Sequence, residues 1–337
     1  MNVKINIIIK AQFSKFKFSF GFNPKIDKSD KEYNNFIPKP YKAVCLISAD
    51  LELAWAYRWA KKNENSFNLA EKNGMKTREN VPKILNLCEI YDIPITWATV
   101  GHLFLSNCKR VNKIAHPEIL RLPYFENLYW KYSLGDWFDS DPCTNYIEDP
   151  AWYAPDLVKM INENSIKHEI GCHTFSHIDC RDEICSKDVF ESEILKCKEL
   201  AKEFGIELKS FVHPGFTIGH LEDIEKLGFT SFRTNYANEL TYPKKHFSKL
   251  WEFRNTMEFC WRKEWSINYH IKRYKTIIDR AIQYNKICVF WFHPSLETNF
   301  VDYVLPEILA YLNYKSQEIK CLTHSDYADW LNEINNY

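Results

Sequence analysis

The sequence has little glycine, no net charge and no long apolar run. Only nine of its 337 residues are glycine, and neither Gly-x-Gly-x-x-Gly nor a Gly-Lys-Ser/Thr phosphate loop occurs, which disfavours a nucleotide-binding fold. Lysine plus arginine (44) balances aspartate plus glutamate (44), so neither nucleic acid nor an anionic membrane surface is a predicted partner. Apolar runs such as 287–292 are far shorter than the ~20 residues of a membrane span.

No Cys-x-x-Cys pair occurs among the eleven cysteines. A secretory leader is not expected either, because the first ten residues hold only four isoleucines and the next ten are interrupted by Lys15 and Lys17. These features predict a cytoplasmic protein with reduced, mostly buried cysteines. The 45% apolar and 16% aromatic content predicts a sizeable core, and aromatic side chains also suit a sugar-facing cleft.

The first 40 residues differ from the rest of the chain. Phenylalanines at positions 16, 18, 20 and 22 alternate with polar or small residues, which predicts a strand with one buried face. A polar, proline-containing stretch then runs to Pro40. We therefore expect residues 1–40 to form an N-terminal extension, and residues 41–337 to form a single domain.

From Ala43 onward, apolar runs alternate with segments of helical periodicity. The predicted strands are 43–49, 93–99, 168–172, 210–212, 229–232 and 287–292. The predicted helices are 82–91, 155–166, 188–204, 217–227 and about 267–284, and a last strand–helix pair lies near 319–331. This order predicts an α/β fold of parallel βα units, either a closed barrel or an open doubly wound sheet. Residues 107–150 and 236–265 break the pattern and are predicted to be long loops that wall a substrate cleft.

Polar residues come directly after four of the predicted strands. The four clusters are Asp50 with Glu52, His173 with His177, His213 with Pro214, and His293 with Pro294. Because the carboxyl ends of parallel strands gather on one rim, where ligands bind in such folds, we expect these clusters to meet. The four together predict a functional site.

The two histidines at 173 and 177 allow three interpretations. On a helical turn, both rings would lie on one face and could bind a divalent metal. They could instead simply pack in the core, or belong to a zinc knuckle. A knuckle would recruit Cys172, Cys180 and Cys185. The metal site is favoured because Asp50 and Glu52, two residues apart on an extended chain, point to one face and would add a carboxylate.

Several motifs resemble those of the polysaccharide deacetylases with a NodB-homology domain. The segment 173–177 (H-T-F-S-H), preceded by Gly171, resembles the metal motif of that family. The segment 93–97 (I-P-I-T-W) with Gly101-His102 resembles the second strand and loop of the subgroup that acts on peptidoglycan, imide or surface-glycan substrates. Residues 292–294 (F-H-P) resemble the late motif.

The resemblance extends over about residues 43–331, and 324–330 resembles the closing helix of the family. It implies a distorted (β/α) barrel of the polysaccharide deacetylase type, with an N-terminal extension and long loops over the C-terminal rim. The implied activity is metal-dependent hydrolysis of the N-acetyl amide of an amino sugar. The expected substrate is a polysaccharide or glycan precursor, either nucleotide-linked or lipid-linked.

The resemblance also implies roles for particular residues. Glu52, His173 and His177 would hold a divalent metal, zinc first, although two histidines and a carboxylate also suit iron, cobalt or nickel. Asp50 would be the general base, and His293 the general acid. The residues expected to contact substrate are Trp97, His102, His213 and Pro214.

Two departures from the family pattern matter. Leu51 stands where the commonest first motif has a second aspartate, so either Asp50 or Glu52 could be the metal ligand. Val212 stands where the third motif has an arginine that orients the base. Two other functions stay open, namely a cyclic amide or imide hydrolase on the same scaffold and a non-catalytic glycan-binding relative. The sequence predicts no particular oligomeric state.

Overall fold

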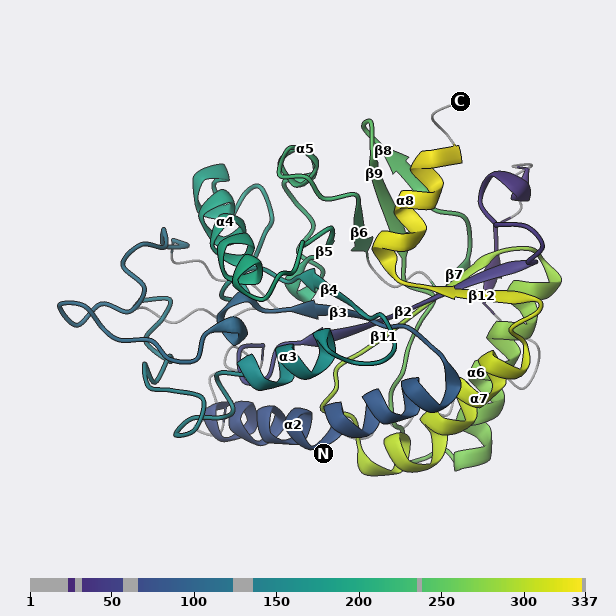
Figure 1. The fold of residues 1–337 in the computed structure, drawn as a ribbon, viewed down its shortest axis with the longest axis horizontal. Helices are drawn as coiled ribbons and strands as arrows, with labels where there is room; N and C mark the ends of the chain where they lie inside the picture. The colour runs from purple at the N-terminus through teal and green to yellow at the C-terminus, as the bar shows by residue number, and fades with distance from the viewer. Residues whose placement is uncertain (1–23, 28–31, 57–65, 124–135, 235–237, 335–337) are drawn as a thin grey trace, which may run out of the picture.

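The computed structural model describes residues 24–27, 32–56, 66–123, 136–234 and 238–334. In this part of the chain, helices flank a curved, mainly parallel sheet (Figure 1). The strand predicted at 16–22 lies outside the described residues. None of the helices described is both long and apolar enough to span a membrane.

The elements alternate as the sequence predicts. The strands are β1 (Lys25–Ile26), β2 (Ala43–Leu51), β3 (Thr96–Thr99), β4 (Glu169–Cys172), β5 (Ser210–Val212), β6 (Ser231–Thr234), β7 (Glu239–Leu240), β8 (Lys244–His246), β9 (Leu250–Arg254), β10 (Met257–Glu258), β11 (Ile287–Phe292) and β12 (Ile319–Leu322). The α-helices are α2 (Ser66–Tyr91), α3 (Pro155–Asn162), α4 (Lys187–Glu203), α5 (Leu221–Lys226), α6 (Ile267–Gln283), α7 (Leu305–Tyr314) and α8 (His324–Ile334). Short 3-10 helices are η1 (Tyr33–Asn35), η3 (Gly101–Phe104) and η4 (Pro214–Phe216), and η5 (Phe300–Val304) is a π-helix.

The parallel strands succeed one another around a barrel. β2, β3, β4, β5, β6 and β9 pair side by side in chain order, and β11 pairs with the other edge of β2. After β9 the chain continues into β10, which pairs with β11. Between them, Asn255 N donates to Thr234 O of β6 and Thr256 N donates to Val289 O of β11. These contacts bring the chain from β9 back to β11, which pairs with β2, the first long strand of the sheet. The predicted distorted (β/α) barrel is confirmed.

The barrel is distorted at β2. β12 pairs with the first half of this strand (residues 43–46), whereas β3 pairs with the second half (residues 48–51). Since β11 pairs with positions 44–49, β12 and β3 must share the remaining edge of β2. Figure 1 shows β12 and β3 on either side of the middle of this long strand. The second half of β2 therefore ends among β3, β4 and β11, where the site lies.

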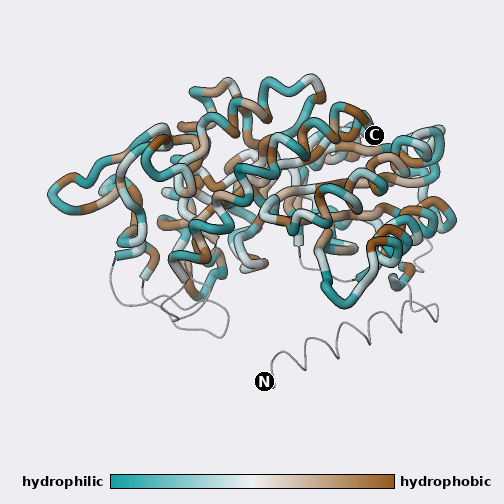
Figure 2. Tube along the Cα trace, turned by 90° about the horizontal axis from the view of Figure 1, so that it is seen from below, coloured by the Kyte–Doolittle hydropathy of each residue, from teal (hydrophilic) through white to brown (hydrophobic). Residues whose placement is uncertain are grey.

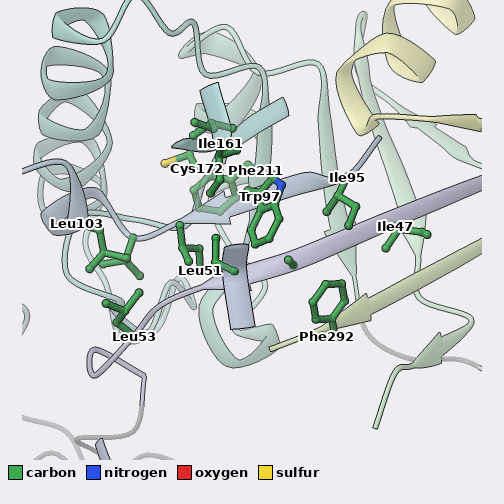
Figure 3. Close-up of a cluster of buried hydrophobic side chains, with 14 of the residues drawn as sticks. Ile47, Leu51, Leu53, Ile95, Trp97, Leu103, Ile161, Cys172, Phe211 and Phe292 are labelled. Carbon is green, nitrogen blue, oxygen red and sulfur yellow. The ribbon is translucent and has the colours of Figure 1, made fainter. Parts of the chain in front are cut away.

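The side chains of β2 alternate between two environments, as the two-residue period of a strand requires. The odd positions from 43 to 51 lie in the main apolar core, together with residues of α2, α6 and α7. Figure 3 shows part of this core, with Leu51, Trp97, Phe211 and Phe292. On the even side, Val44 and Leu46 pack in a second cluster with residues of α8. The same face continues into Ser48 and Asp50, so it changes from apolar to polar toward the end of the strand.

The N-terminal residues that the structure describes pack against the barrel domain. β1 pairs in parallel with β7, and Ile37 is buried in the cluster beneath α8. The hydroxyl of Tyr327 donates a hydrogen bond of 2.5 Å to Phe36 O. The predicted division between residues 1–40 and 41–337 stays a prediction.

Several predicted boundaries need correction. The helix predicted at 82–91 is only the second half of α2, because Pro82 lies inside this helix and does not begin it. The helix predicted at 217–227 is shorter (α5), and α7 had no predicted counterpart. The loop prediction for 236–265 was wrong in part, since the segment contains β7, β8, β9 and β10. Its Trp251 packs in the core with 3% of its surface exposed, so it does not wall a cleft.

The other predicted loop is irregular where it is described. Residues 107–123 and 136–150 contain isolated bridges but no helix or strand of their own. Figures 1 and 2 show this segment projecting from the end of the barrel that lies beyond α3 and α4. Figure 2 shows hydrophilic and hydrophobic residues mixed along it.

Candidate active site

Side chains from four strand ends meet at one rim of the barrel. Glu52 comes directly after β2, His173 after β4, and His293 after β11. Arg233 comes from β6 itself. Because these strands run parallel in one barrel, their carboxyl ends lie together, as the sequence predicts for the clusters that contain Glu52, His173 and His293.

Glu52 is the centre of a buried group with two histidines. Its Oε1 lies 2.8 Å from His173 Nε2 and 3.1 Å from His177 Nε2. Exposure is 3% for Glu52, 1% for His173 and 4% for His177. The remaining oxygen, Glu52 Oε2, lies 3.5 Å from His293 Nε2. One carboxylate therefore joins three of the predicted site histidines.

The turn from His173 to His177 is a bend, and the helical turn assumed for this spacing was wrong. Thr174 and His177 both have left-handed backbone conformations, with φ of 58° and 57°, which non-glycine residues seldom adopt. Ser176 secures the turn, because its N and Oγ both donate to the Glu193 carboxylate of α4, at 2.7 and 2.6 Å. The rings of His173 and His177 meet with centroids 5.0 Å apart. The strained turn achieves the convergence that a helix would have given.

Asp50 is held by a guanidinium from another strand. Arg233 Nη1 donates to Asp50 Oδ1 and Nη2 donates to Oδ2, each at 2.6 Å, and Nη1 also donates to Ser48 Oγ at 2.9 Å. Arg233 has 1% of its side chain exposed and Asp50 has 5%. Such a bidentate, charge-assisted pair fixes the plane of the carboxylate more firmly than a single contact.

Arg233 lies beside the position where the sequence lacks an arginine. Val212 of β5 and Arg233 of β6 are direct partners in the register of these two strands. The guanidinium therefore comes from the adjacent strand, at the position paired with Val212. Arg233 was not predicted as a site residue, because the predicted strand ended at position 232. A signal was present, since an arginine between Phe232 and Thr234 in a short strand is unusual unless it is paired.

His293 has a mixed apolar and charged environment. Its ring contacts that of Trp291, with centroids 5.3 Å apart, and the ring of Phe216 lies 5.2 Å from Trp291 in the same wall. Glu258 of β10 is nearby. Burial raises the pKa of Glu258, although the charge of His293 opposes this. His293 is the most open member of the group, with 33% of its side chain exposed, so it is accessible to a substrate.

The electrostatics of Glu52 favour a carboxylate that stays ionised. Burial by itself would raise the pKa of Glu52, but the charges of His293 and His177 and the hydrogen bond from His173 outweigh it and lower the pKa well below its usual range. Deep burial of a negative charge among histidine nitrogens is the environment in which a cation is stabilised.

The residues around Glu52 fit a divalent metal. The donor atoms of Glu52, His173 and His177 lie within 4.8 Å of one another. His173 Nδ1 lies 2.6 Å from Val212 O, so an Nδ1–H donated to this carbonyl would leave the Nε2 lone pair directed at the group. Metal-bound histidines almost always have such a second hydrogen bond. Cys172, the nearest cysteine in sequence, lies in the apolar core and belongs to no metal-capable group among the described residues, so the zinc-knuckle interpretation has no support.

The predicted substrate-contacting residues are not brought to the surface of this site. Trp97 and His102 have 0% of their surface exposed, His213 has 1%, and Pro214 is buried. His213 Nε2 lies 3.0 Å from Gly219 O, and burial lowers the pKa of this ring to about 4. His102 lies in a separate group with Asp141. These side chains offer no surface to a ligand in the structure, and their contact with a substrate stays a prediction.

Comparisons with known proteins agree with this geometry. The polysaccharide deacetylase family model matches residues 61–230, which is half of the chain. The match includes His173 and His177 but neither Glu52 nor His293. A search of the curated proteins finds no match.

Solved structures share the fold at low sequence identity. A protein from Mycobacterium smegmatis described as a polysaccharide deacetylase superposes with a TM-score of 0.60 at 12% identity, over 89% of this chain and 93% of its own. One of the same description from Pseudomonas aeruginosa PAO1 gives 0.59 at 11% identity, over 92% and 100%. Puue allantoinase gives 0.58 at 12% identity, over 92% and 96%. With the family match over half of the sequence and the barrel fold, the chain belongs to the polysaccharide deacetylase family.

Proposed function

We propose that this protein is a metal-dependent deacetylase that hydrolyses the N-acetyl amide of an amino sugar. The observation that carries the proposal is the pairing of two carboxylates with different partners at one rim. Glu52 faces His173 and His177, whereas Asp50 is held by Arg233. This division supports Glu52 as the metal ligand and Asp50 as the general base.

Each residue of the group has its own part in the proposed reaction. When bound at Glu52, His173 and His177, a divalent metal would polarise the acetyl carbonyl and acidify a water molecule. Asp50, oriented by Arg233, accepts the proton of the attacking water. His293, which is partly exposed at the edge of the group, donates a proton to the leaving amine of the sugar.

The finer features of the proposal rest on the donor set and the composition. Two histidines and a carboxylate suit zinc first, with iron, cobalt or nickel as alternatives. We propose a cytoplasmic protein acting on a nucleotide- or lipid-linked sugar of surface-glycan assembly. The eleven cysteines, none of which forms a disulfide, support a reducing compartment.

A cyclic amide or imide hydrolase is the second candidate. It is favoured by the likeness to Puue allantoinase, which extends over almost the whole of both chains. Against it, the side chain of Leu51 points into the core, and the position of Glu52 beside His173 and His177 supports Glu52 as the ligand in its place. Both reactions hydrolyse a C–N bond, so only the substrate separates them.

The experiment compares substrates and metal content in the same preparations. Purified protein should contain metal at the Glu52 group and release acetate from N-acetylhexosamine derivatives, and His173→Ala should lose both properties while keeping its circular dichroism spectrum. A panel of cyclic amides and imides is assayed in parallel. Acetate release without ring opening supports the deacetylase, and ring opening alone supports the second candidate. A folded, metal-loaded protein that binds glycans but turns over neither class would contradict both.

A further inference from the structure

We propose a second metal site in this protein, a structural zinc site formed by His102, Cys108, His116 and Asp141. None of these residues belongs to the group around Glu52. They come from η3 and from the irregular segment that comes after it, which the barrel strands do not order. The donor set, two imidazoles, a thiolate and a carboxylate, contains the ligand types that zinc binds in four-coordinate structural sites.

The four donor atoms are already gathered around one point. Asp141 Oδ2 lies 3.0 Å from His102 Nε2, 2.9 Å from His116 Nε2 and 3.5 Å from Cys108 Sγ. All four donors lie within 4.8 Å of one another. Ligands at the usual zinc–nitrogen and zinc–sulfur bond lengths are separated by about 3.3–3.7 Å in a tetrahedron. A small outward movement of these side chains would therefore admit the ion.

The orientation of His102 suits a bound cation. Its Nδ1 lies 3.2 Å from Trp152 O and its Nε2 lies 3.0 Å from Asp141 Oδ2, so both nitrogens of a fully buried ring face acceptors. If Nδ1–H donates to the carbonyl, the Nε2 lone pair faces the carboxylate, and a cation between them removes the repulsion. His173 has the same arrangement beside Glu52, with Val212 O in the place of Trp152 O.

The ligands are held from outside by further hydrogen bonds. Cys143 N donates to Asp141 Oδ1 at 2.9 Å, and Tyr153 OH donates to the same oxygen at 3.2 Å. Arg110 Nη2 donates to Asp141 O at 2.8 Å. Such contacts orient metal ligands in known sites. A surface pocket of about 240 Å³, whose lining includes Cys108 and His116, gives an ion access from solvent.

The proposed site is joined to the candidate active site through the backbone. Gly101 N donates to Thr174 O, and His102 N donates to Phe175 O, at 2.8 and 2.9 Å, between the two histidines that face Glu52. The ring of Phe175 contacts those of His102 and His116. Zinc bound here would fasten residues 105–123 and 136–154 against this strained turn, and its role would be structural because no substrate needs to reach it.

The test counts metal ions and identifies the thiolate. Wild-type protein should hold about two zinc ions per chain by elemental analysis after dialysis. Cys108→Ser and Asp141→Asn should each lose one of them and keep the other. Cys321→Ser is the matched control, since Cys321 is a half-buried cysteine of β12 outside the donor set, and this variant should keep both ions.

Cobalt substitution decides the matter even if a variant fails to fold. The group around Glu52 contains no sulfur, so a thiolate-to-cobalt charge-transfer band can come only from Cys108 among the two sites. We expect this band in the wild type and in His177→Ala, which weakens the other site, and its loss in Cys108→Ser. A wild type that binds only the ion at Glu52 and shows no such band would overturn the second site and leave the proposed deacetylase intact. Conversely, absence of acetate release would leave the cobalt result unaffected.

Discussion

Arg233 and Asp50 form a buried, two-point ion pair that spans the barrel from β6 to β2, with both N–O distances at 2.6 Å. Because Arg233 contacts both carboxylate oxygens of Asp50, it can hold Asp50 in one orientation. Val212, at the position where the family motif has an arginine, is not needed for this. Trp291 and Phe216 enclose the guanidinium, whose Cζ lies 5.1 and 5.8 Å from their ring centroids. The pair links the stability of the barrel to the geometry of the candidate base.

Replacing Arg233 by leucine should affect both stability and catalysis. The change leaves Asp50 buried without its counter-ion, which should lower the free energy of unfolding by about 3–5 kcal/mol. With the base no longer oriented, kcat for acetate release should fall by about 10²-fold or more. Urea denaturation and steady-state kinetics measure the two effects. Unchanged kcat in folded Arg233→Leu would contradict a role for Arg233 in orienting the base.

The register of β5 and β6 provides a sharper test by relocation. The double variant Val212→Arg with Arg233→Leu moves the guanidinium to the neighbouring strand position. We expect it to recover part of the kcat that Arg233→Leu loses, because Asp50 regains a partner on the same level. Val212→Arg alone should destabilise the protein, since it places a second buried cation beside the first. A double variant no more active than Arg233→Leu would show that the two positions are not interchangeable.

Glu52 and Asp50 can be separated by isosteric amides. Glu52→Gln removes the charge that faces His173 and His177, and should weaken metal binding at this group by more than about 100-fold. Asp50→Asn, the matched control, should keep the metal and lose activity by about 10²–10⁴-fold. Calorimetric titration of the metal-free variants measures the affinity. The reverse pattern, with metal lost in Asp50→Asn and kept in Glu52→Gln, would exchange the two roles.

His293 should matter for the rate and not for metal affinity. In His293→Gln, kcat should fall by about 10²–10⁴-fold, because the leaving amine loses its proton donor, while metal content stays as in the wild type. Steady-state kinetics and elemental analysis of the two proteins measure the two effects. An unchanged kcat in folded His293→Gln would assign the acid to another group.

His168 should make stability depend on pH. Ile95 N donates to its Nδ1 at 3.1 Å, and burial lowers the pKa of the ring to about 4, against about 6.5 in the unfolded chain. Between these values the unfolded state binds the extra proton. The stability is therefore complete above pH ~6.5 and falls as the pH is lowered toward ~4, by up to about 3 kcal/mol from this residue.

His168→Asn tests this prediction, because the asparagine carbonyl can accept the Ile95 hydrogen bond without titrating. Denaturation between pH 4 and 7 should give a smaller loss of stability on acidification than in the wild type. His168 lies just before β4 and away from the Glu52 group, so metal content should not change. A pH dependence identical to that of the wild type would assign the acid sensitivity to the other buried histidines.

The sequence by itself determined the alternation of strands and helices in the barrel and predicted several members of the candidate site. Continuous apolar runs can be recognised as buried parallel strands because both of their faces need apolar side chains. β5 and β11 accordingly have the predicted ends. Acidic residues or histidines directly after such runs could be placed on one rim, because parallel strands end together. This is why Glu52, His173 and His293 were found without a structure.

Only the tertiary structure decided which residues are partners across the fold. The pairing of Arg233 with Asp50 joins positions 183 residues apart and depends on the register of neighbouring strands, which no local pattern encodes. The segment that holds Cys108, His116 and Asp141 has no periodicity, so its convergence on His102 could not be read from spacing. The sequence supplied the chemical groups, whereas strand register and a long irregular segment determined the distances between them.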